Sequence, residues 1–320
     1  MYFIPNRKHL SASGSQLGDR KRVRQLSPLT PGQSGGAHAP ANIAPLPASS
    51  NFIPVVQGSE YEDVLTGGQP TCLGSGAFGQ VFLKRKRSDG DLAAFKTLLA
   101  VSDGDAMAGY QGMLDELRVM MAVQHRPEFP KVIGIVNLTT FALEFVGDAI
   151  TMRSTTLRCV VRRPPATLAA LGLVNICLDV AKGLRALHDA GWSHNDLHSR
   201  NVLVCHPPSG SGHNWGAKII DLGKATRLSD SAPVKDMLCM RIPPELTEGP
   251  VPLGVFTDLY SMAYLFSDVI QCKPELTATC IQTVYQQCKR LCPDMPALTT
   301  IIQDVEDFKI SLVSQAARAS

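Results

Sequence analysis

Five short motifs follow one another along the middle of this chain, and their order constrains the fold more than composition does. They are GSGAFGQV at 74–81, AAFK ending at Lys96, a helical segment around Glu116, HNDLHSRN at 194–201 and DLG at 221–223. Each holds residue types that suit phosphate or Mg²⁺: glycines, a lysine, carboxylates and an asparagine. A domain that uses all five must bring distant segments of the chain together at one site.

The glycine-rich segment is a weak signal alone, because GxGxxG also marks dinucleotide-binding units in which the loop opens a helix. Here residues 78–83 continue as a β-like run, and KRKRSDGD at 84–91 supplies charge and an Asp-Gly turn. LAAFKTLLA at 92–100 indicates another strand, so the sequence predicts a strand–loop–strand hairpin. We expect phosphates to approach the backbone, where a side chain would obstruct them, at Gly74, Gly76 and Gly79.

Lys96 closes the last of these strands, where its ammonium can hold phosphates if a carboxylate keeps it oriented. Glu116 is the candidate, because it lies beside the apolar face of an expected helix. That face holds Met113, Leu117, Met120 and Met121. A second helix is expected before the motif at 194–201 and should be buried in the core, because apolar residues recur along it at helical spacing. They are Cys177, Val180, Ala181, Leu184 and Leu187.

In this order the motifs resemble the eukaryotic protein kinase family over roughly residues 65–310. PPE at 243–245 and DLYSMA at 258–263 extend the resemblance past the site. It implies an α+β, bilobal fold with a small antiparallel β N-lobe carrying one helix and a larger, mainly helical C-lobe. The expected domains are a disordered basic tail at 1–55, a kinase domain at 56–312 and a C-terminal tail at 313–320. Within the kinase domain, the N-lobe would comprise residues 56–146 and the C-lobe residues 147–312.

The resemblance also implies site roles and cofactors, namely ATP and Mg²⁺. Lys96 and Glu116 would position phosphates, Asp196 would handle the proton of the acceptor hydroxyl, and Mg²⁺ would be bound by Asn201 and Asp221. Val81, Ala94 and Leu203 would enclose the adenine, with Leu143 behind it. The remaining nucleotide contacts would come from the backbone of Glu144 to Val146 and from the glycine-rich loop, which comprises Leu73, Gly74, Ser75, Gly76, Ala77, Phe78 and Gly79.

Several residues depart from the family pattern. Asn195 stands where the family has the arginine that pairs with a phosphate group on the activation segment. Control by phosphorylation at Thr226, Ser229 or Ser231 is therefore not expected. The catalytic loop is half tyrosine-kinase-like, because Arg200 matches that form while His198 replaces the lysine of serine/threonine kinases. Met295 stands at the position of the arginine that usually pairs with Glu245, and we expect Arg290 to take its place.

Two other function classes stay open. A pseudokinase would keep the fold and signal by binding, which the missing arginine at Asn195 favours and the presence of all five polar site residues opposes. A small-molecule phosphotransferase of the aminoglycoside or choline type shares the HxDLHxxN form, including His198, but lacks the GxGxFGxV and PPE-like patterns. A zinc site is not expected from the three histidines at 188, 194 and 198, because no Cys/His pair at zinc spacing accompanies them.

Composition agrees with an intracellular globular domain behind a polar tail. Residues 1–50 hold six Lys/Arg and one acid, so of the chain's net charge of +3 the remainder carries −2. No nucleic-acid partner is therefore expected for the folded part, while the tail can bind an acidic partner. A protein substrate, no membrane and a cytoplasmic location are expected, with the nucleus as an alternative because DRKRVR at 19–24 resembles an import signal. The nine cysteines are expected to be free thiols.

Overall fold

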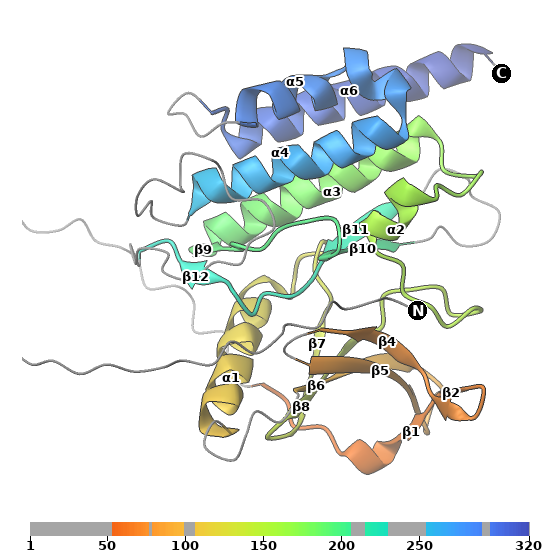
Figure 1. Cartoon of the computed structure of the whole chain (residues 1–320), viewed down its shortest axis with the longest axis vertical. Coiled ribbons are helices and arrows are strands. Elements are labelled where there is room, and N and C mark those ends of the chain that lie inside the picture. Colours follow the sequence, from red (N-terminus) through yellow and green to blue (C-terminus); the bar gives the residue numbers. More distant parts are fainter. Residues whose placement is uncertain are drawn as a thin grey trace, which may run out of the picture. The chain divides into compact units, whose positions relative to one another are not determined.

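The computed structural model describes six stretches of the chain: 53–76, 79–98, 106–205, 215–229, 254–289 and 295–319. All belong to one unit, residues 50–320. Within it, an antiparallel sheet with one helix beside it forms an N-terminal lobe, and a mainly helical lobe follows (Figure 1). The expected α+β, bilobal fold is confirmed. The predicted tail lies almost entirely outside the described residues.

The N-lobe sheet has the order β1-β5-β6-β8-β7, with β4 also paired to β5, and its pairs are antiparallel. A short hairpin of β2 (Leu65–Thr66) and β3 (Gln69–Pro70) and a 3-10 turn (Gly58–Glu60) lie near its start. Strands β5 and β6 pair antiparallel across the charged turn at 87–91, so the predicted strand–loop–strand hairpin is confirmed. Strands β4 and β5 pair in the same way across the glycine-rich loop. The sheet strands are β1 (Tyr61–Asp63), β4 (Cys72–Ser75), β5 (Gly79–Lys86), β6 (Leu92–Leu98), β7 (Val132–Asn137) and β8 (Thr140–Glu144).

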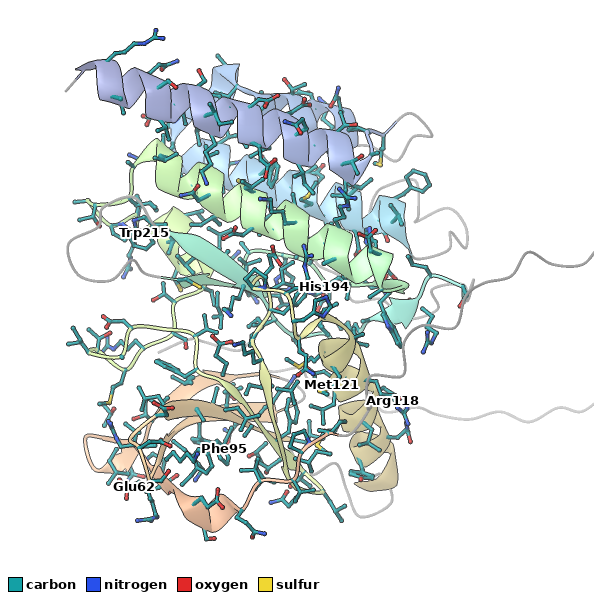
Figure 2. The ribbon with its side chains drawn as sticks, turned by 180° about the vertical axis from the view of Figure 1, so that it is seen from behind. Glu62, Phe95, Arg118, Met121, His194 and Trp215 are labelled. Carbon is teal, nitrogen blue, oxygen red and sulfur yellow. The ribbon has the colours of Figure 1, made fainter. Side chains whose placement is uncertain are left out.

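Strand β6 shows how the sheet aims Lys96. Side chains alternate between the two faces of a strand, so Ala93 and Phe95 share one face while Ala94 and Lys96 share the other. Ala93 and Phe95 belong to a small core cluster with Tyr61 (Figure 2 labels Phe95 within the sheet). Lys96 consequently points away from that cluster, and its ammonium reaches helix α1.

Helix α1 (Ala106–Val123) buries the predicted apolar face, with Met113, Leu117 and Met120 each at most 3% exposed. It ends at Val123, and the amide of Arg126 donates to the Val123 carbonyl at 2.9 Å in the turn that follows. Pro127 disfavours helical backbone at Arg126, so the helix does not resume there.

The C-terminal lobe is organised around α3 (Ala170–Asp189), whose predicted apolar residues are all fully buried. Helices α4 and α6 both pack against α3, and α5 packs against α4 and α6 (Figure 1). No helix among the residues described is both long and apolar enough to span a bilayer. The other elements are α2 (Leu157–Arg162), β9 (Trp192–Ser193), β10 (Val202–Cys205), β11 (Gly216–Ile219), β12 (Thr226–Arg227), α4 (Val255–Cys272), a 3-10 helix (Pro274–Ala278), α5 (Cys280–Cys288) and α6 (Leu298–Ala319).

Candidate active site

Lys96 lies between two carboxylates that come from different lobes. Its Nζ is 2.7 and 2.8 Å from the two oxygens of Glu116 on α1 and 3.2 Å from Oδ1 of Asp221, which follows β11. The Lys96 and Glu116 side chains are 14% and 6% exposed, whereas that of Asp221 is 42% exposed. We call these three residues the nucleotide side of the site. The structure brings together here three residues that the sequence singled out separately.

Burial and charge act in opposite directions on the nucleotide side. Burial alone would lower the pKa of Lys96, but the Glu116 and Asp221 carboxylates outweigh it and raise that pKa above its ordinary value. Burial raises the pKa of Glu116, and the Lys96 ammonium opposes that rise. Asp221 adopts a left-handed backbone with φ of 63°, a conformation that Asp and Asn tolerate better than most residues. A buried ammonium held in this way is a fixed positive charge, which is what binding of an anion requires.

The glycine-rich loop offers open backbone where phosphates were expected. A Cβ built on Gly74 or Gly76 would meet no atom within 4 Å. Gly79 is different, because a Cβ there would lie 2.6 Å from the Thr97 carbonyl oxygen. Gly79 is therefore required by the close pairing of β5 with β6. Ala77 and Phe78 lie outside the described residues, while Leu73 and Ser75 are on β4.

The residues expected to enclose the adenine come from both lobes. Ala94 on β6 pairs with Leu143 on β8, and Val81 on β5 pairs with Lys96. Leu203 lies on β10 in the C-lobe. In the segment that joins the lobes, the Glu144 amide donates to the Lys131 carbonyl and the Ser154 hydroxyl donates to the Val146 carbonyl.

Asp258 anchors the loop at 194–201 through hydrogen bonds to its backbone. Its side chain is fully buried on α4, and its two carboxylate oxygens accept hydrogen bonds from the amides of His194 at 2.8 Å and Asn195 at 2.9 Å. His188 Nε2 lies 2.9 Å from Oδ2 of the same carboxylate. The motif DLYSMA drew attention to Asp258, but the sequence did not predict that this carboxylate anchors the loop. His194, labelled in Figure 2, is itself fully buried.

Asn201 connects the loop to the strand that leads to Asp221. Its Nδ2 donates to the Asp196 carbonyl at 2.9 Å, and its own carbonyl accepts from the Ile220 amide at 2.9 Å. Asn201 and Asp221 are thereby set on neighbouring segments. An amide oxygen and an accessible carboxylate are ligands that suit Mg²⁺, which takes one or two protein ligands and completes its shell with phosphates and water.

Asp196 lies between two cationic or titratable groups. Lys224 Nζ is 3.0 Å from its Oδ2, and His198 Nε2 is 3.9 Å from its Oδ1. Burial lowers the pKa of His198, and the Asp196 carboxylate opposes that change. Together with Asn195, these residues form what we call the acceptor side of the site. No sequence pattern pointed to Lys224, because it lies 28 positions from Asp196 in an irregular segment.

Asn195 binds the segment that follows Asp221. Its Nδ2 donates to the Lys224 carbonyl at 3.0 Å and to Thr226 Oγ1 at 2.9 Å, with its own backbone left-handed at φ 63°. The pairing of β9 with β12 continues this connection, since Ser193 lies opposite Thr226. The start of the activation segment is thus held by a neutral amide at the position where the family has an arginine. Glu245 and Arg290, whose pairing the sequence predicts, lie outside the described residues.

A second link joins the lobes at their connecting segment. Lys218 on β11 places its Nζ 3.0 Å from Oε2 of Glu144 and 3.1 Å from the Phe129 carbonyl. The Lys131 amide also donates to Glu144 Oε2 at 3.0 Å. The sequence predicted a role only for the backbone of Glu144, because no spacing rule shows that Lys218 on β11 meets Glu144 at the end of β8.

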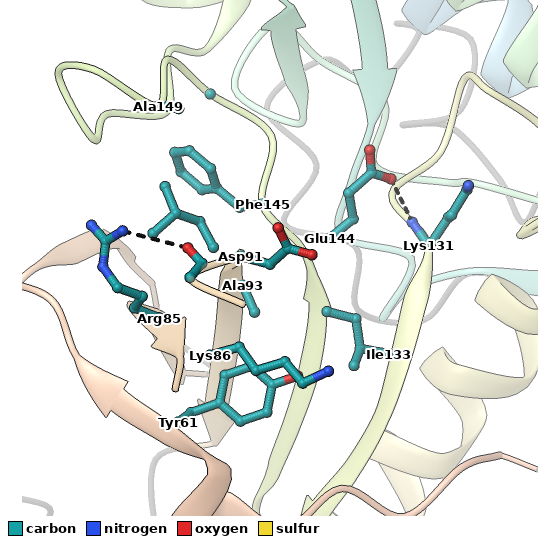
Figure 3. A pocket seen from close by; sticks show the side chains of 13 residues that line it. Tyr61, Arg85, Lys86, Asp91, Ala93, Lys131, Ile133, Glu144, Phe145 and Ala149 are labelled. Carbon is teal, nitrogen blue, oxygen red and sulfur yellow. Dashed lines mark hydrogen bonds between the residues drawn. The ribbon is translucent and has the colours of Figure 1, made fainter. Parts of the chain in front are cut away.

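A pocket of about 680 Å³ opens beside the N-lobe sheet (Figure 3). Its lining includes Tyr61 and Ala93 of the small core cluster, and Arg85, Lys86 and Asp91 give it a mixed charge. It shares Glu144 and Phe145 with the segment expected to contact the adenine, but its lining includes neither Lys96 nor Asp196.

Comparison with known proteins agrees with this geometry. The model of the protein kinase domain family matches residues 69–317, so this chain belongs to that family. Similar proteins include the melanoma receptor tyrosine-protein kinase of Xiphophorus maculatus, 30% identical over 157 residues that make up 49% of this chain and 12% of that protein. The serine/threonine-protein kinase PkaB of Streptomyces coelicolor is 27% identical over 207 residues, 62% of this chain and 44% of that protein.

The angiopoietin-1 receptor of Danio rerio is a third relative, 29% identical over 188 residues, 54% of this chain and 15% of that protein. The alignments with these three relatives cover less than half of each relative's length. Their names include tyrosine and serine/threonine kinases alike. Family membership is accordingly shared with proteins that act on different hydroxyl groups.

Proposed function

We propose that this chain transfers the γ-phosphoryl group of MgATP to a hydroxyl group of a protein. The observation that supports this most is the position of Lys96, held by Glu116 and Asp221 at hydrogen-bond distance. Bringing three ionised groups together across two lobes costs free energy of desolvation, and a protein without phosphate chemistry would have no function that requires it.

The nucleotide would be held by the N-lobe and the segment that joins the lobes. Its adenine would lie among Val81, Ala94 and Leu203 with Leu143 behind it, and would meet the backbone of Glu144 to Val146. Its phosphates would lie under the glycine-rich loop, where Gly74 and Gly76 leave open space. Lys96 would bind them as a fixed donor.

Asn201 and Asp221 would hold Mg²⁺ on the phosphates, since both offer oxygen ligands beside Lys96 and Asp196. When bound, MgATP supplies the phosphoryl group: the bond from its γ-phosphorus to the bridging oxygen breaks, a bond to the acceptor oxygen forms, and ADP leaves. Asp196 orients the acceptor hydroxyl and receives its proton. The protein contributes by positioning and by fixed charge, which are the main sources of rate enhancement in this chemistry.

The choice of a protein acceptor rests on the family and on the loop. HNDLHSRN also suits small-molecule phosphotransferases, but the family model that matches this chain is that of protein kinases. The test is a transfer assay on the full chain with radiolabelled ATP, offered mixed protein substrates in one set and aminoglycosides and choline in another. Label on protein hydroxyls supports the proposal. Label only on small molecules, or tight nucleotide binding without transfer to either set, contradicts it and favours the corresponding alternative.

A further inference from the structure

Lys224 is a charged residue at the centre of the site to which the proposed mechanism assigns no task. Its Nζ is 3.0 Å from Asp196 Oδ2, with the Lys224 side chain 35% exposed and that of Asp196 12% exposed. The lysine therefore covers one oxygen of the group proposed to receive the acceptor's proton. A residue in this position either blocks that carboxylate or leaves it when a ligand arrives.

The backbone of Lys224 is fixed while its side chain can move. Asn195 Nδ2 donates to the Lys224 carbonyl at 3.0 Å, and the Ala225 amide donates to the Leu222 carbonyl at 3.0 Å. Leu222 is only 2% exposed, which anchors this turn in the core. A lysine side chain carries its charge on a flexible four-carbon stem, so the ammonium can shift by several ångströms from a fixed origin.

The charges around the Lys224 ammonium indicate which anion would attract it. Lys96 is already engaged by Glu116 and Asp221, whereas among the residues that the structure describes Lys224 forms an ion pair with one carboxylate, that of Asp196. Lys224 also lies three positions after Asp221, the proposed metal ligand, and its ammonium pairs with Asp196, the proposed proton acceptor. The Lys224 ammonium is partly exposed to solvent, which screens its attraction to Asp196, so a phosphate carrying more negative charge can displace the carboxylate.

We propose that the Lys224 ammonium binds the terminal phosphate of the nucleotide, and that by leaving Asp196 it frees that carboxylate for the acceptor hydroxyl. This inference rests on the proposed function. The cation next to the transferred group then comes from the segment after DLG and not from position 198 of the loop, which holds a histidine. The exchange links phosphate binding to release of the proton acceptor without a phosphorylation event.

The experiment compares nucleotides that differ by the terminal phosphate. Calorimetry in the presence of Mg²⁺ gives the dissociation constants of the protein for ADP and for a non-hydrolysable ATP analogue. They are measured for the full wild-type chain and for its Lys224→Met and Lys224→Arg variants. Lys182→Met is the matched control, because Lys182 is 33% exposed and pairs with Glu306 at 2.6 Å outside the site.

Lys224→Met should weaken binding of the analogue by about tenfold or more and change ADP binding by less than about twofold, as expected for loss of one charged hydrogen bond. Lys224→Arg should restore most of the difference, and Lys182→Met should change neither constant. Equal effects on both nucleotides, or tighter binding of the analogue by Lys224→Met, would overturn the inference alone. A wild-type chain that binds neither nucleotide would overturn the proposed function and the inference with it.

Discussion

The two sides of the candidate site are built differently. On the nucleotide side, Lys96 and Glu116 form a buried pair from two regular elements, β6 and α1, and the family's residue types are intact. On the acceptor side, Asp196 meets Lys224 from an irregular segment, and Asn195 and His198 depart from the family pattern. Under the proposed function, nucleotide binding would depend on the regular elements β6 and α1, whereas the residues that distinguish this chain from the family would act on the acceptor side.

The largest expected effect comes from removing the cation of the nucleotide side. Lys96→Met leaves Glu116 and Asp221 without their shared partner and removes a fixed donor to phosphate, so transfer should fall by about 10²-fold or more. Lys84→Met is the matched control, because Lys84 on β5 pairs with Asp63 at the surface. Initial rates of label transfer and dissociation constants for MgATP would be measured on both. If the two variants behave alike, the nucleotide side is misassigned.

A substitution in the core of the C-lobe, away from both sides of the site, should change the stability of the fold and leave nucleotide binding and transfer unchanged. Asp179 on α3 accepts a hydrogen bond from the Ala217 amide at 2.9 Å, and burial raises its pKa to about 6, with Glu128 adding to the rise and Lys182 and Lys309 opposing it. A raised folded-state pKa means that the stability gained from the protonated form is present below pH 4 and is lost as the pH rises through 6.

Asp179→Asn should therefore raise the free energy of unfolding at pH 7.5 by about 1–3 kcal/mol, and this gain should disappear toward pH 4. Urea unfolding at a series of pH values measures it. Transfer rates and nucleotide affinities should stay near those of the wild type. A variant that is less stable than the wild type at pH 7.5 would show that the charged carboxylate is needed for the hydrogen bond to β11.

Asn195 should affect the acceptor side alone. Asn195→Ala removes two hydrogen bonds to the segment after DLG and places alanine at a positive φ, which together should cost about 1–2 kcal/mol of stability and lower transfer. Asn195→Gly removes the same bonds but tolerates the backbone, so its stability loss should be smaller while its loss of transfer is similar. MgADP affinity should be unchanged in both variants. Weakened MgADP binding would mean that the two sides are not separable.

The smallest effect is expected from the hydroxyls of the activation segment. Thr226 Oγ1 makes neutral hydrogen bonds with Asn195 Nδ2 and with Ser193 Oγ, and position 195 holds no arginine that could pair with a phosphate. A triple alanine variant at Thr226, Ser229 and Ser231, the last outside the described residues, should keep transfer within about threefold of wild type. Phosphatase treatment of the wild type should change the rate equally little. A tenfold drop in either case would identify a phosphorylation-dependent control that uses another cation.

The same contrast explains what the sequence could predict. Apolar residues at helical spacing predicted the helices that carry Glu116 and precede Asp196, and the Asp-Gly turn at 89–90 predicted the hairpin of β5 and β6. Contacts within irregular segments could not be predicted, because they depend on where two distant loops meet. Lys224 with Asp196 is one example, and the two amides held by Asp258 are another. The residue identities were visible, but no spacing rule places their side chains against one another.

The central claim is that Asp196 takes part in transfer while the nucleotide side binds MgATP independently of it. The most direct test measures both quantities on one preparation of the full chain carrying Asp196→Asn, with single-turnover transfer of label to protein and calorimetric binding of MgATP. The account predicts transfer lowered by about 10²–10⁴-fold with MgATP affinity nearly unchanged. Transfer at the wild-type rate, or an equal loss of binding and transfer, would contradict it.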